Sequence, residues 1–437
     1  MRKLLLIFCL FVQLSWALDR QPNADYHARR QALASKIKNG VVLLFAPNEA
    51  EGPNDLFGYR PDDNFFYLSG WPEPGAALLI AASPEHPYTE ILFLPDHNPS
   101  QEKWTGPKLG PENPDAAKIT GFDRVVAMDN LRSELIRLLP GPKASVYTDI
   151  PEGQQVSNST AALDWLKRAN SFPVYVSFQD VRPPLASLRT VKDAGEIERI
   201  RKATDASIAA HLAAMRAIKP GITEREISAL MQYEWGKRGC ERSAYAPIVG
   251  SGFNSTVLHY SRDSETVRDG DVVLIDAAGE YSMYASDITR TLPASGKFTA
   301  RQRKIYDIVL GAQRAAIAAF QPGKSTLKKD HLNSLHDVAY NYINTHGKDS
   351  HGEPLGKYFI HGLSHYVGLN VHDEGDYEVA VGPGMVFTIE PGIYIPEEKL
   401  GVRIEDVFYV DITGKLINLA GTLPHTADEV EHAMAGQ

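Results

Sequence analysis

Two pairs of acidic residues in the second half of the chain have the types and spacing of a metal site. The first pair follows the apolar run Val272–Ile275, which leads into Asp276, and Asp287 comes eleven residues later. If the chain turns between Glu280 and Met283, positions 276 and 287 lie opposite each other in an antiparallel hairpin, with Cβ atoms about 5 Å apart. Two carboxylates so placed are costly unless they are protonated or bridged by a cation. The alternative is an exposed hairpin whose register differs by a residue or two.

The second pair repeats this arrangement farther along the chain. Another apolar run, Val386–Ile389, leads into Glu390, and Glu405 follows fifteen residues later. A hairpin that turns at Glu397 and Glu398 places position 390 opposite position 405. Two hairpins that each align a pair of inward acids favour one shared site over coincidence.

Histidines lie between the two hairpins and add nitrogen donors. His361, His365 and His372 fall within twelve residues. The His361/His365 spacing matches the zincin helix, but Gly362 stands where that motif requires Glu, so this interpretation fails. Four carboxylates and one imidazole suit a pair of Mn²⁺, Co²⁺ or Zn²⁺ ions. Cations about 3.5–4 Å apart can generate a bridging hydroxide and polarise a carbonyl, so hydrolysis is the expected reaction.

The elements that must position these residues differ between the two halves of the chain. The first half reads as strands alternating with helices, and the prolines of Arg182-Pro183-Pro184 indicate a domain boundary there. In the second half, three helices begin with an N-cap residue and a Glu or Gln three positions later. Strands dominate from about residue 245, which predicts an α+β fold with a mostly antiparallel sheet backed by helices. The predicted buried strands are 41–45, 76–80 and 91–94, and the predicted cap pairs are Asp193/Glu196, Thr223/Glu226 and Thr299/Gln302.

Composition and charge exclude several classes of protein. The 437 residues include 45 Lys and Arg against 54 Asp and Glu, for a net charge of −9, which argues against a nucleic-acid partner. Residues 1–17 have a basic start, an apolar run and small residues before position 18, as in a cleavable signal peptide. That run is too short to span a bilayer, which needs about 20 apolar residues. The prediction is export to the periplasm or the medium, without a stable membrane span.

The candidate ligands and the sequences around them resemble a known family. The four acids and His365 resemble the ligand signature of the pita-bread metallopeptidases, and the sequences around them resemble aminopeptidase P, the Xaa-Pro aminopeptidases. The N-terminal half is similar to the N-terminal domain of that family through Arg60, Phe65, Tyr67 and Gly70 and through residues 104–110. The ligand positions are Asp276, Asp287, His365, Glu390 and Glu405, within the strings 361–365, 371–373, 388–392 and 402–406.

The resemblance implies the domains and the activity. It implies a smaller α/β N-terminal domain over 24–180 and a pita-bread catalytic domain over 187–437. The implied enzyme removes the first residue of peptides that carry proline in second position, through a metal-bridging hydroxide. It also implies two divalent ions per subunit, Mn²⁺ first with Zn²⁺ or Co²⁺ as alternatives, and a homodimer or homotetramer.

The resemblance also implies a role for each site residue. Asp276 would hold one metal, His365 and Glu390 the other, and Asp287 and Glu405 would bridge both. Glu390 would handle the proton of the bridging water. The remaining side chains would line the substrate site and bind the scissile carbonyl or its oxyanion, or contact the proline side of the substrate; they are His259, His361, His372 and Arg403. For Arg403, an ion pair that merely orients Glu405 is the alternative.

Related proteins offer rival functions. Prolidase shares the fold and ligands but cleaves only Xaa-Pro dipeptides; the sequence Gly-Leu-Ser before His365 favours aminopeptidase P over it. Methionine aminopeptidase lacks such an N-terminal domain, and creatinase works without metals. A binding protein that has lost catalysis is the alternative from a different class, and the complete ligand set argues against it.

Overall fold

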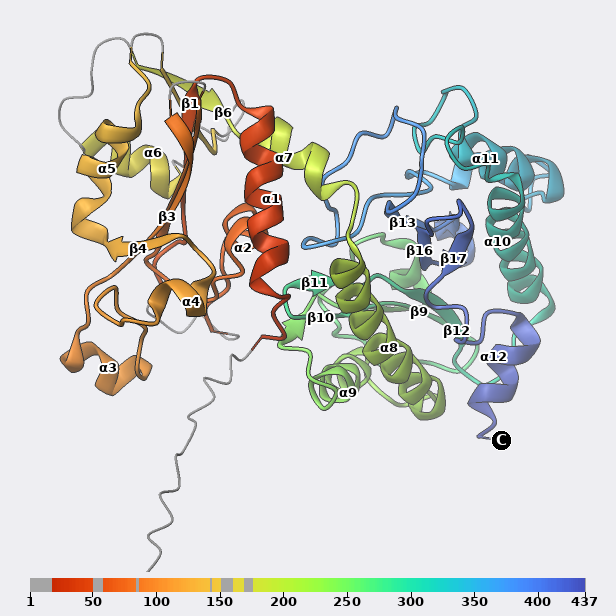
Figure 1. The fold of residues 1–437 in the computed structure, drawn as a ribbon. Helices are drawn as coiled ribbons and strands as arrows, with labels where there is room; N and C mark the ends of the chain where they lie inside the picture. Colours follow the sequence, from red (N-terminus) through yellow and green to blue (C-terminus); the bar gives the residue numbers. More distant parts are fainter. Residues whose placement is uncertain are drawn as a thin grey trace, which may run out of the picture.

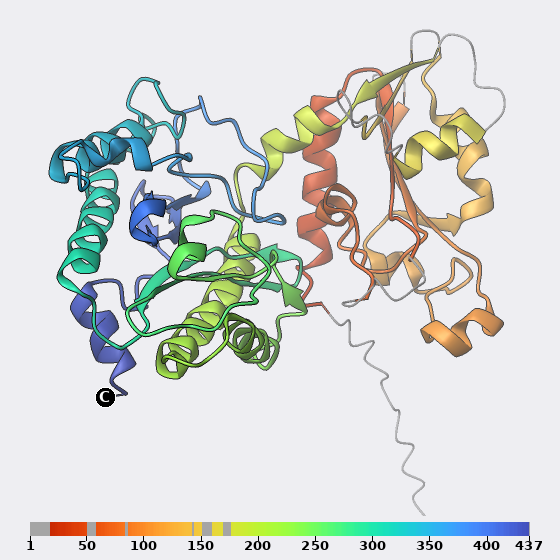
Figure 2. The ribbon, with the colours of Figure 1, turned by 180° about the vertical axis from the view of Figure 1, so that it is seen from behind.

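The computed structural model describes residues 18–49, 58–83, 86–141, 144–150, 160–168 and 176–436. The predicted signal peptide, 1–17, lies outside the described residues. Two domains stand side by side, with the N-terminal sheet on one side and the C-terminal strands and helices on the other (Figures 1 and 2). Within the described part of the chain, no helix has the length and apolar character that crossing a membrane requires.

The N-terminal domain is built on one mixed sheet with the strand order β4-β3-β2-β1-β5-β6. β2 pairs antiparallel with both β1 and β3. The outer strands are parallel to their neighbours: β4 pairs with β3, β5 with β1, and β6 with β5. The three predicted buried strands are confirmed as β1, β2 and β3, whose apolar side chains fill both faces. The strands are β1 Gly40–Phe45, β2 Ala77–Ser83, β3 His86–Leu94, β4 Arg124–Ala127, β5 Ser145–Thr148 and β6 Ser177–Asp180.

Short helices cover the two faces of this sheet (Figure 1). α2 carries the apolar residues Phe65–Leu68 and ends at Gly70, whose φ of 59° is the left-handed conformation that glycine adopts without strain. The bounds are α1 Asn23–Lys36, α2 Asp63–Ser69, α3 Pro99–Thr105, α4 Ala116–Thr120, α5 Leu131–Leu138 and α6 Ala161–Arg168.

A helix joins the two domains. The prolines at 183 and 184 lie in the first turn of α7, Arg182–Arg189, where a missing N–H costs no helical hydrogen bond. All three predicted caps are confirmed as capping boxes, at the starts of α8, α9 and α10. The C-terminal helices are α8 Ala194–Ala217, α9 Glu224–Gly236, α10 Ala300–Ala319, α11 Leu335–His346 and α12 Ala427–Met434.

Short antiparallel strands form the centre of the C-terminal domain, and its helices pack against them. One apolar core includes side chains from α8, α9 and α10 and from β9, β12 and β13, which confirms the predicted α+β architecture. The strands are β7 Arg242–Ser243, β8 Ile248–Ser251, β9 Val272–Asp276, β10 Gly279–Tyr281, β11 Tyr284–Ala285, β12 Thr289–Pro293, β13 Val386–Ile389, β14 Gly392–Ile395, β15 Leu400–Arg403, β16 Asp406–Val410 and β17 Leu416–Asn418.

The first hairpin has a different register from the predicted one. Asp276 pairs with Thr289 rather than with Asp287. The turn is centred one residue later than expected, because Ser282 and Met283 both adopt positive φ, 48° and 76°, as in the two-residue turns that suit hairpin twist. The pairing partner of each residue therefore shifts by two positions. Because side chains alternate with a period of two, Asp276 and Asp287 still point to the same face of the hairpin.

The second hairpin has the predicted register. Ile389 pairs with Asp406 on one side of the acids, and Gly392 pairs with Arg403 on the other. Both pairings belong to one alignment, which places Glu390 opposite Glu405 between the β13–β16 and β14–β15 pairs.

Candidate metal centre

Four of the five predicted ligands come from the ends of strands that meet in the core of the C-terminal domain. Asp276 is the last residue of β9, and Asp287 lies just before β12. Glu390 and Glu405 lie between strand pairs of the second hairpin. His365 comes from the loop before β13, where its backbone N–H and C=O both bond to Thr388, at 3.1 and 2.9 Å. Strand ends thus deliver four carboxylates to one buried point, and a paired loop adds the imidazole.

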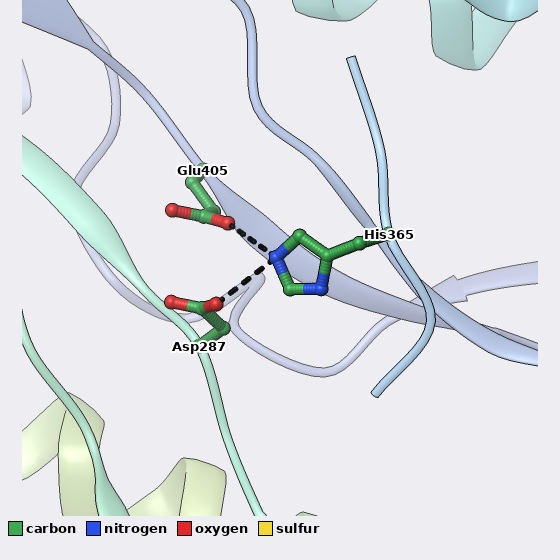
Figure 3. A group of neighbouring side chains, drawn as sticks. All are labelled: Asp287, His365 and Glu405. Atoms are coloured by element: carbon green, nitrogen blue, oxygen red, sulfur yellow. Dashed lines mark ion pairs between the residues drawn. The ribbon is translucent and has the colours of Figure 1, made fainter. Parts of the chain in front are cut away.

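His365 lies beside Asp287 and Glu405, and one of its ring nitrogens faces both carboxylates (Figure 3). Its Nε2 atom is 3.2 Å from Asp287, 3.4 Å from Glu390 and 3.8 Å from Glu405. One ligand atom from each of Asp287, His365 and Glu405 lies within 4.8 Å of the others. Nδ1 of His365 is 3.1 Å from the carbonyl oxygen of Tyr366. A hydrogen bond from Nδ1–H to that carbonyl leaves Nε2 free to act as a metal ligand.

Asp276 joins the group through a tyrosine that the sequence analysis did not identify. The Tyr245 hydroxyl lies 2.6 Å from a carboxylate oxygen of Asp276 and 2.6 Å from one of Asp287. The other oxygen of Asp276 accepts a 2.6 Å hydrogen bond from Arg403. All five predicted ligand residues are therefore brought together, even though the register of the first hairpin differs from the expected one.

The charges of the group call for a cation. Burial, together with the charges of Glu405 and Asp276, raises the pKa of Asp287 well above its usual value. Burial and the charge of Glu405 do the same to the pKa of Glu390. Burial alone would lower the pKa of His365, but Asp287 and Glu405 raise it well above its usual value. Protons satisfy these carboxylates only in part, whereas divalent cations would satisfy all four and suit this oxygen-rich donor set.

The other three predicted histidines differ in their surroundings. The His372 ring lies against His365, with ring centroids 4.1 Å apart. His361 Nε2 is 2.8 Å from the Tyr394 hydroxyl, and its Nδ1 is 2.8 Å from the carbonyl oxygen of Gly362. Burial lowers the pKa of His361 to about 3. His372 is more exposed, and partial burial together with the neighbouring His365 lowers its pKa to about 4, so both imidazoles are neutral at pH 7. His259 is exposed, and its electrostatic interaction with both other imidazoles places it near them.

Arg403 is buried and engaged with protein groups. Its Nη1 donates to the Tyr394 hydroxyl at 2.7 Å, its Nε to Thr289 Oγ1 at 3.0 Å, and its Nη2 to Asp276. Nε is 3.9 Å from Glu405, a longer and weaker contact than that with Asp276. The guanidinium therefore orients Asp276 more directly than Glu405, and contact with substrate stays a prediction.

Three neighbours of the ligands had not been identified from the sequence. Tyr245 bridges two acids, Thr289 Oγ1 donates to Glu405 at 2.6 Å, and Tyr394 connects Arg403 to His361. Alternation along the strands could have indicated two of them, since Thr289 lies two residues after Asp287 and Tyr394 four after Glu390. Tyr245 lies in no comparable pattern, and only the folded chain brings it to the site.

Family models match both domains. Residues 198–411 match the metallopeptidase family M24, and residues 26–147 match the aminopeptidase P N-terminal domain. These two matches cover the region of the metal centre and most of the N-terminal sheet.

Individual proteins resemble the chain over nearly its whole length. The Xaa-Pro aminopeptidase of Escherichia coli K12 is 33% identical over 94% of this chain and 97% of its own, and human Xaa-Pro aminopeptidase 3 is 31% identical over 93% and 85%. Among solved structures, proline aminopeptidase P II from Yersinia pestis has a TM-score of 0.83 at 33% identity, covering 95% of this chain and 100% of that one. Aminopeptidase P from E. coli with the inhibitor Pro-Leu has a TM-score of 0.82 at 32% identity, covering 95% and 99%. The five converging ligands and these matches together show that the chain belongs to the aminopeptidase P group of metallopeptidase family M24, with a pita-bread catalytic domain.

Proposed function

We propose that this metallo-exopeptidase releases the N-terminal residue of peptides that carry proline in second position. The observation that carries the proposal is the buried cluster in which three carboxylates lie within 3.8 Å of His365 Nε2 and Asp276 joins them through Tyr245, in a chain that has both domains of aminopeptidase P. Its relatives named Xaa-Pro aminopeptidase match the whole architecture rather than one motif, which supports the same substrate class here.

The five ligand residues would hold two divalent cations. Asp276 would bind one, His365 and Glu390 the other, with Asp287 and Glu405 shared between them; we propose Mn²⁺, with Co²⁺ or Zn²⁺ as alternatives. When bound, such cations supply Lewis acidity that polarises a carbonyl and acidifies water. The donor set of hard oxygens plus one imidazole fits this assignment, and so does the negative charge that Arg403 alone does not neutralise.

The protein groups around the cluster would handle protons and substrate. Glu390 is the proposed general base, because the family resemblance assigns it the proton of the bridging water and one of its oxygens lies 3.7 Å from His361. The neutral imidazole of His372 and the exposed His259 would donate hydrogen bonds to the scissile carbonyl as negative charge develops on its oxygen, and His361 would line the same site.

Arg403 and Tyr394 would orient the groups that meet the substrate. The Tyr394 hydroxyl accepts a hydrogen bond from Arg403 and lies 2.8 Å from His361 Nε2, where it can donate. This series of hydrogen bonds fixes the tautomer of His361, with Nδ1–H directed to the carbonyl oxygen of Gly362. Contact between Arg403 and the proline side of the substrate is the further proposal for this residue.

Proline in second position explains why such a site is needed. An Xaa-Pro bond is a tertiary amide without an N–H, and its ring restricts the backbone. Peptidases that bind a substrate as a β-strand lose a hydrogen bond at that position. A site that grips the free amino terminus and the carbonyl does not depend on that hydrogen bond.

The first test is an assay of the mature, Mn²⁺-loaded protein on two substrates, the dipeptide Ala-Pro and the tripeptide Ala-Pro-Ala. Release of Ala from the tripeptide is the expected result. Cleavage of the dipeptide alone would make the enzyme a prolidase, and cleavage of neither with metal bound would contradict the proposal.

Export and assembly are separate proposals. The sequence of residues 1–17 supports cleavage of a signal peptide after Ala17, and sequencing the N-terminus of protein recovered from cells would give Leu18 as the first residue. A homodimer or homotetramer is proposed from the family resemblance, and light scattering of the purified protein would measure it; a monomeric mass would contradict it.

A further inference from the structure

The loop that carries His372, Gly368–Asp373, is bound by residues far away in the chain. It belongs to the segment before β13, which reaches toward the N-terminal domain in both ribbon views (Figures 1 and 2). Val367 and Leu369 are buried in one apolar cluster with Phe65 and Tyr67 of α2. The base of the loop thus lies in a core that the two domains share.

The N-terminal domain holds one side of the loop through polar contacts. Arg60 Nη2 donates to the carbonyl oxygen of Leu369 at 2.8 Å, and Asn370 Nδ2 donates to Asp63 Oδ2. Arg60 Nη1 also donates to Asp63 Oδ1 at 2.8 Å, and its Nε lies 3.0 Å from Glu280. Arg60 therefore links α2, the loop and β10, which gives this residue of the family motif a structural task.

The connecting segment between the domains holds the other side. Asp373 accepts a 2.5 Å hydrogen bond from Arg189 and lies 3.0 Å from Lys192 Nζ. All three side chains are buried. Arg189 Nη1 also donates to Asn64 Oδ1 of α2 at 2.8 Å. A buried carboxylate with two cationic partners resists displacement, because moving it would leave charges unpaired.

His372 lies between these two anchors. It is flanked by Val371 and Asp373, and its ring rests on the metal-site residue His365 at 4.1 Å between centroids. Within the part of the chain that the structure describes, the ring makes no hydrogen bond, so its position depends on the backbone of the loop.

We propose that the N-terminal domain positions His372 of its own chain, with Asp63, Asn370 and Asp373 as positioning residues that act through the loop. The inference rests on the proposed function insofar as His372 contacts substrate. The N-terminal domain would then contribute to turnover without any of these three residues touching the peptide.

The test uses the full chain and a reversed pair. The variant Asn370→Asp puts a carboxylate against Asp63, whereas the double variant Asp63→Asn/Asn370→Asp restores an amide opposite a carboxylate. Glu134→Gln is the control for the loss of a charged contact elsewhere, since Glu134 pairs with two arginines, Arg124 and Arg137, within the N-terminal domain. The readouts are kcat and KM on Ala-Pro-Ala, bound metal, and hydrogen exchange of the segment 366–374.

The expected pattern is specific to a positioning role. Asn370→Asp should lower kcat about tenfold or more with KM and metal content nearly unchanged, since small misplacements of catalytic groups are costly. In this variant the backbone amides of residues 366–374 should exchange hydrogen about tenfold faster than in the wild type. The double variant should recover most of both effects, and the control should show neither. In a His372→Ala background, Asn370→Asp should no longer affect kcat.

Two results would overturn the inference. Unchanged exchange in Asn370→Asp would show that the contact does not hold the loop, and a kcat effect that persists without His372 would show that the loop acts through another group. Wild-type protein that binds metal but cleaves no peptide would instead contradict the proposed function; the exchange data would still decide whether the loop is anchored.

Discussion

The carboxylates of the metal centre are held in their buried positions by hydrogen bonds from neighbouring side chains. Tyr245 shares its hydroxyl between Asp276 and Asp287, Arg403 pairs with Asp276, and Thr289 donates to Glu405. These contacts fix the orientation of these three ligands before any cation binds. At the scale of single residues, substitutions should therefore test proton transfer at Glu390 and support of the metal ligands by Tyr245.

Glu390→Gln should abolish turnover while leaving the fold intact. The amide keeps the size of the side chain but cannot take a proton, and loss of a general base costs about 10²–10⁴-fold in rate. Steady-state kinetics on Ala-Pro-Ala, with circular dichroism as the fold check, would measure this. Glu397→Gln, on the exposed tip of the same hairpin, is the matched control and should retain activity. Full activity in Glu390→Gln would remove the assigned role.

Tyr245→Phe should weaken metal binding more than it disturbs folding. The hydroxyl that orients both Asp276 and Asp287 is lost, and removal of such a partner costs about 10–100-fold in metal affinity. Competition titration with a Mn²⁺ chelator would report the change. Tyr233→Phe, an exposed tyrosine on α9, is the control. Equal affinity in Tyr245→Phe and wild type would show that the hydroxyl does not support the ligands.

At the scale of elements, helices hold the strands that carry the ligands. α8 packs against β10 and β11 and bonds to the chain next to Asp276, since His211 Nε2 donates to the carbonyl oxygen of Ala277 at 3.0 Å. The imidazole is fully buried, and burial, with the nearby charge of Arg290, lowers the pKa of His211 to about 4. The contact therefore makes the stability of this helix–strand pair depend on pH.

His211 should make the protein less stable as the pH falls from about 6.5 to about 4. In that window the unfolded chain binds a proton on this histidine and the folded chain does not, so the unfolded state gains stability. A shift of this size corresponds to about 3 kcal/mol in the free energy of unfolding. Urea unfolding at pH 7 and pH 5 would measure it. His211→Gln should lose this part of the pH dependence and the exposed His346→Gln should not; the same slope in both would contradict the assignment.

At the scale of the whole molecule, metal and stability are linked. Divalent cations that bind the folded cluster and not the unfolded chain stabilise the fold, by about 2.7 kcal/mol per site at a hundredfold excess over Kd. The connection between the domains adds its own constraint, because the shared core and the Arg189–Asp373 pair tie the N-terminal domain to the segment before β13.

Chelation should lower the Tm and remove activity, and Mn²⁺ should restore both. Calorimetry of the chelated protein after return of Mn²⁺, Co²⁺ or Zn²⁺ would rank the ions. Asp287→Asn should bind metal poorly from the start, so chelation should lower its Tm much less. Restoration by Zn²⁺ alone would correct the proposed metal, and two ions retained in Asp287→Asn would contradict the bridging role.

The sequence by itself determined the donor set and much of the local structure. Apolar runs that end in Asp276 and Glu390 predicted strands that deliver acids, and the cap pairs at Asp193, Thr223 and Thr299 predicted three helix starts. These signals are local: alternation and capping depend on residues within one turn or one hairpin. The predicted register of the second hairpin is confirmed for the same reason. Its turn is centred between Glu397 and Glu398, as the positions of Glu390 and Glu405 predicted.

Tertiary structure decided what local patterns do not encode. The left-handed pair Ser282 and Met283 shifted the first hairpin by two residues, because the choice between neighbouring turn positions depends on packing around them. Tyr245 reached the acids from outside any repeating pattern. Asp63 and Asn370 meet across 307 residues. Such contacts form only when separate elements pack together, and neither spacing nor periodicity in the chain specifies which distant residues will face each other.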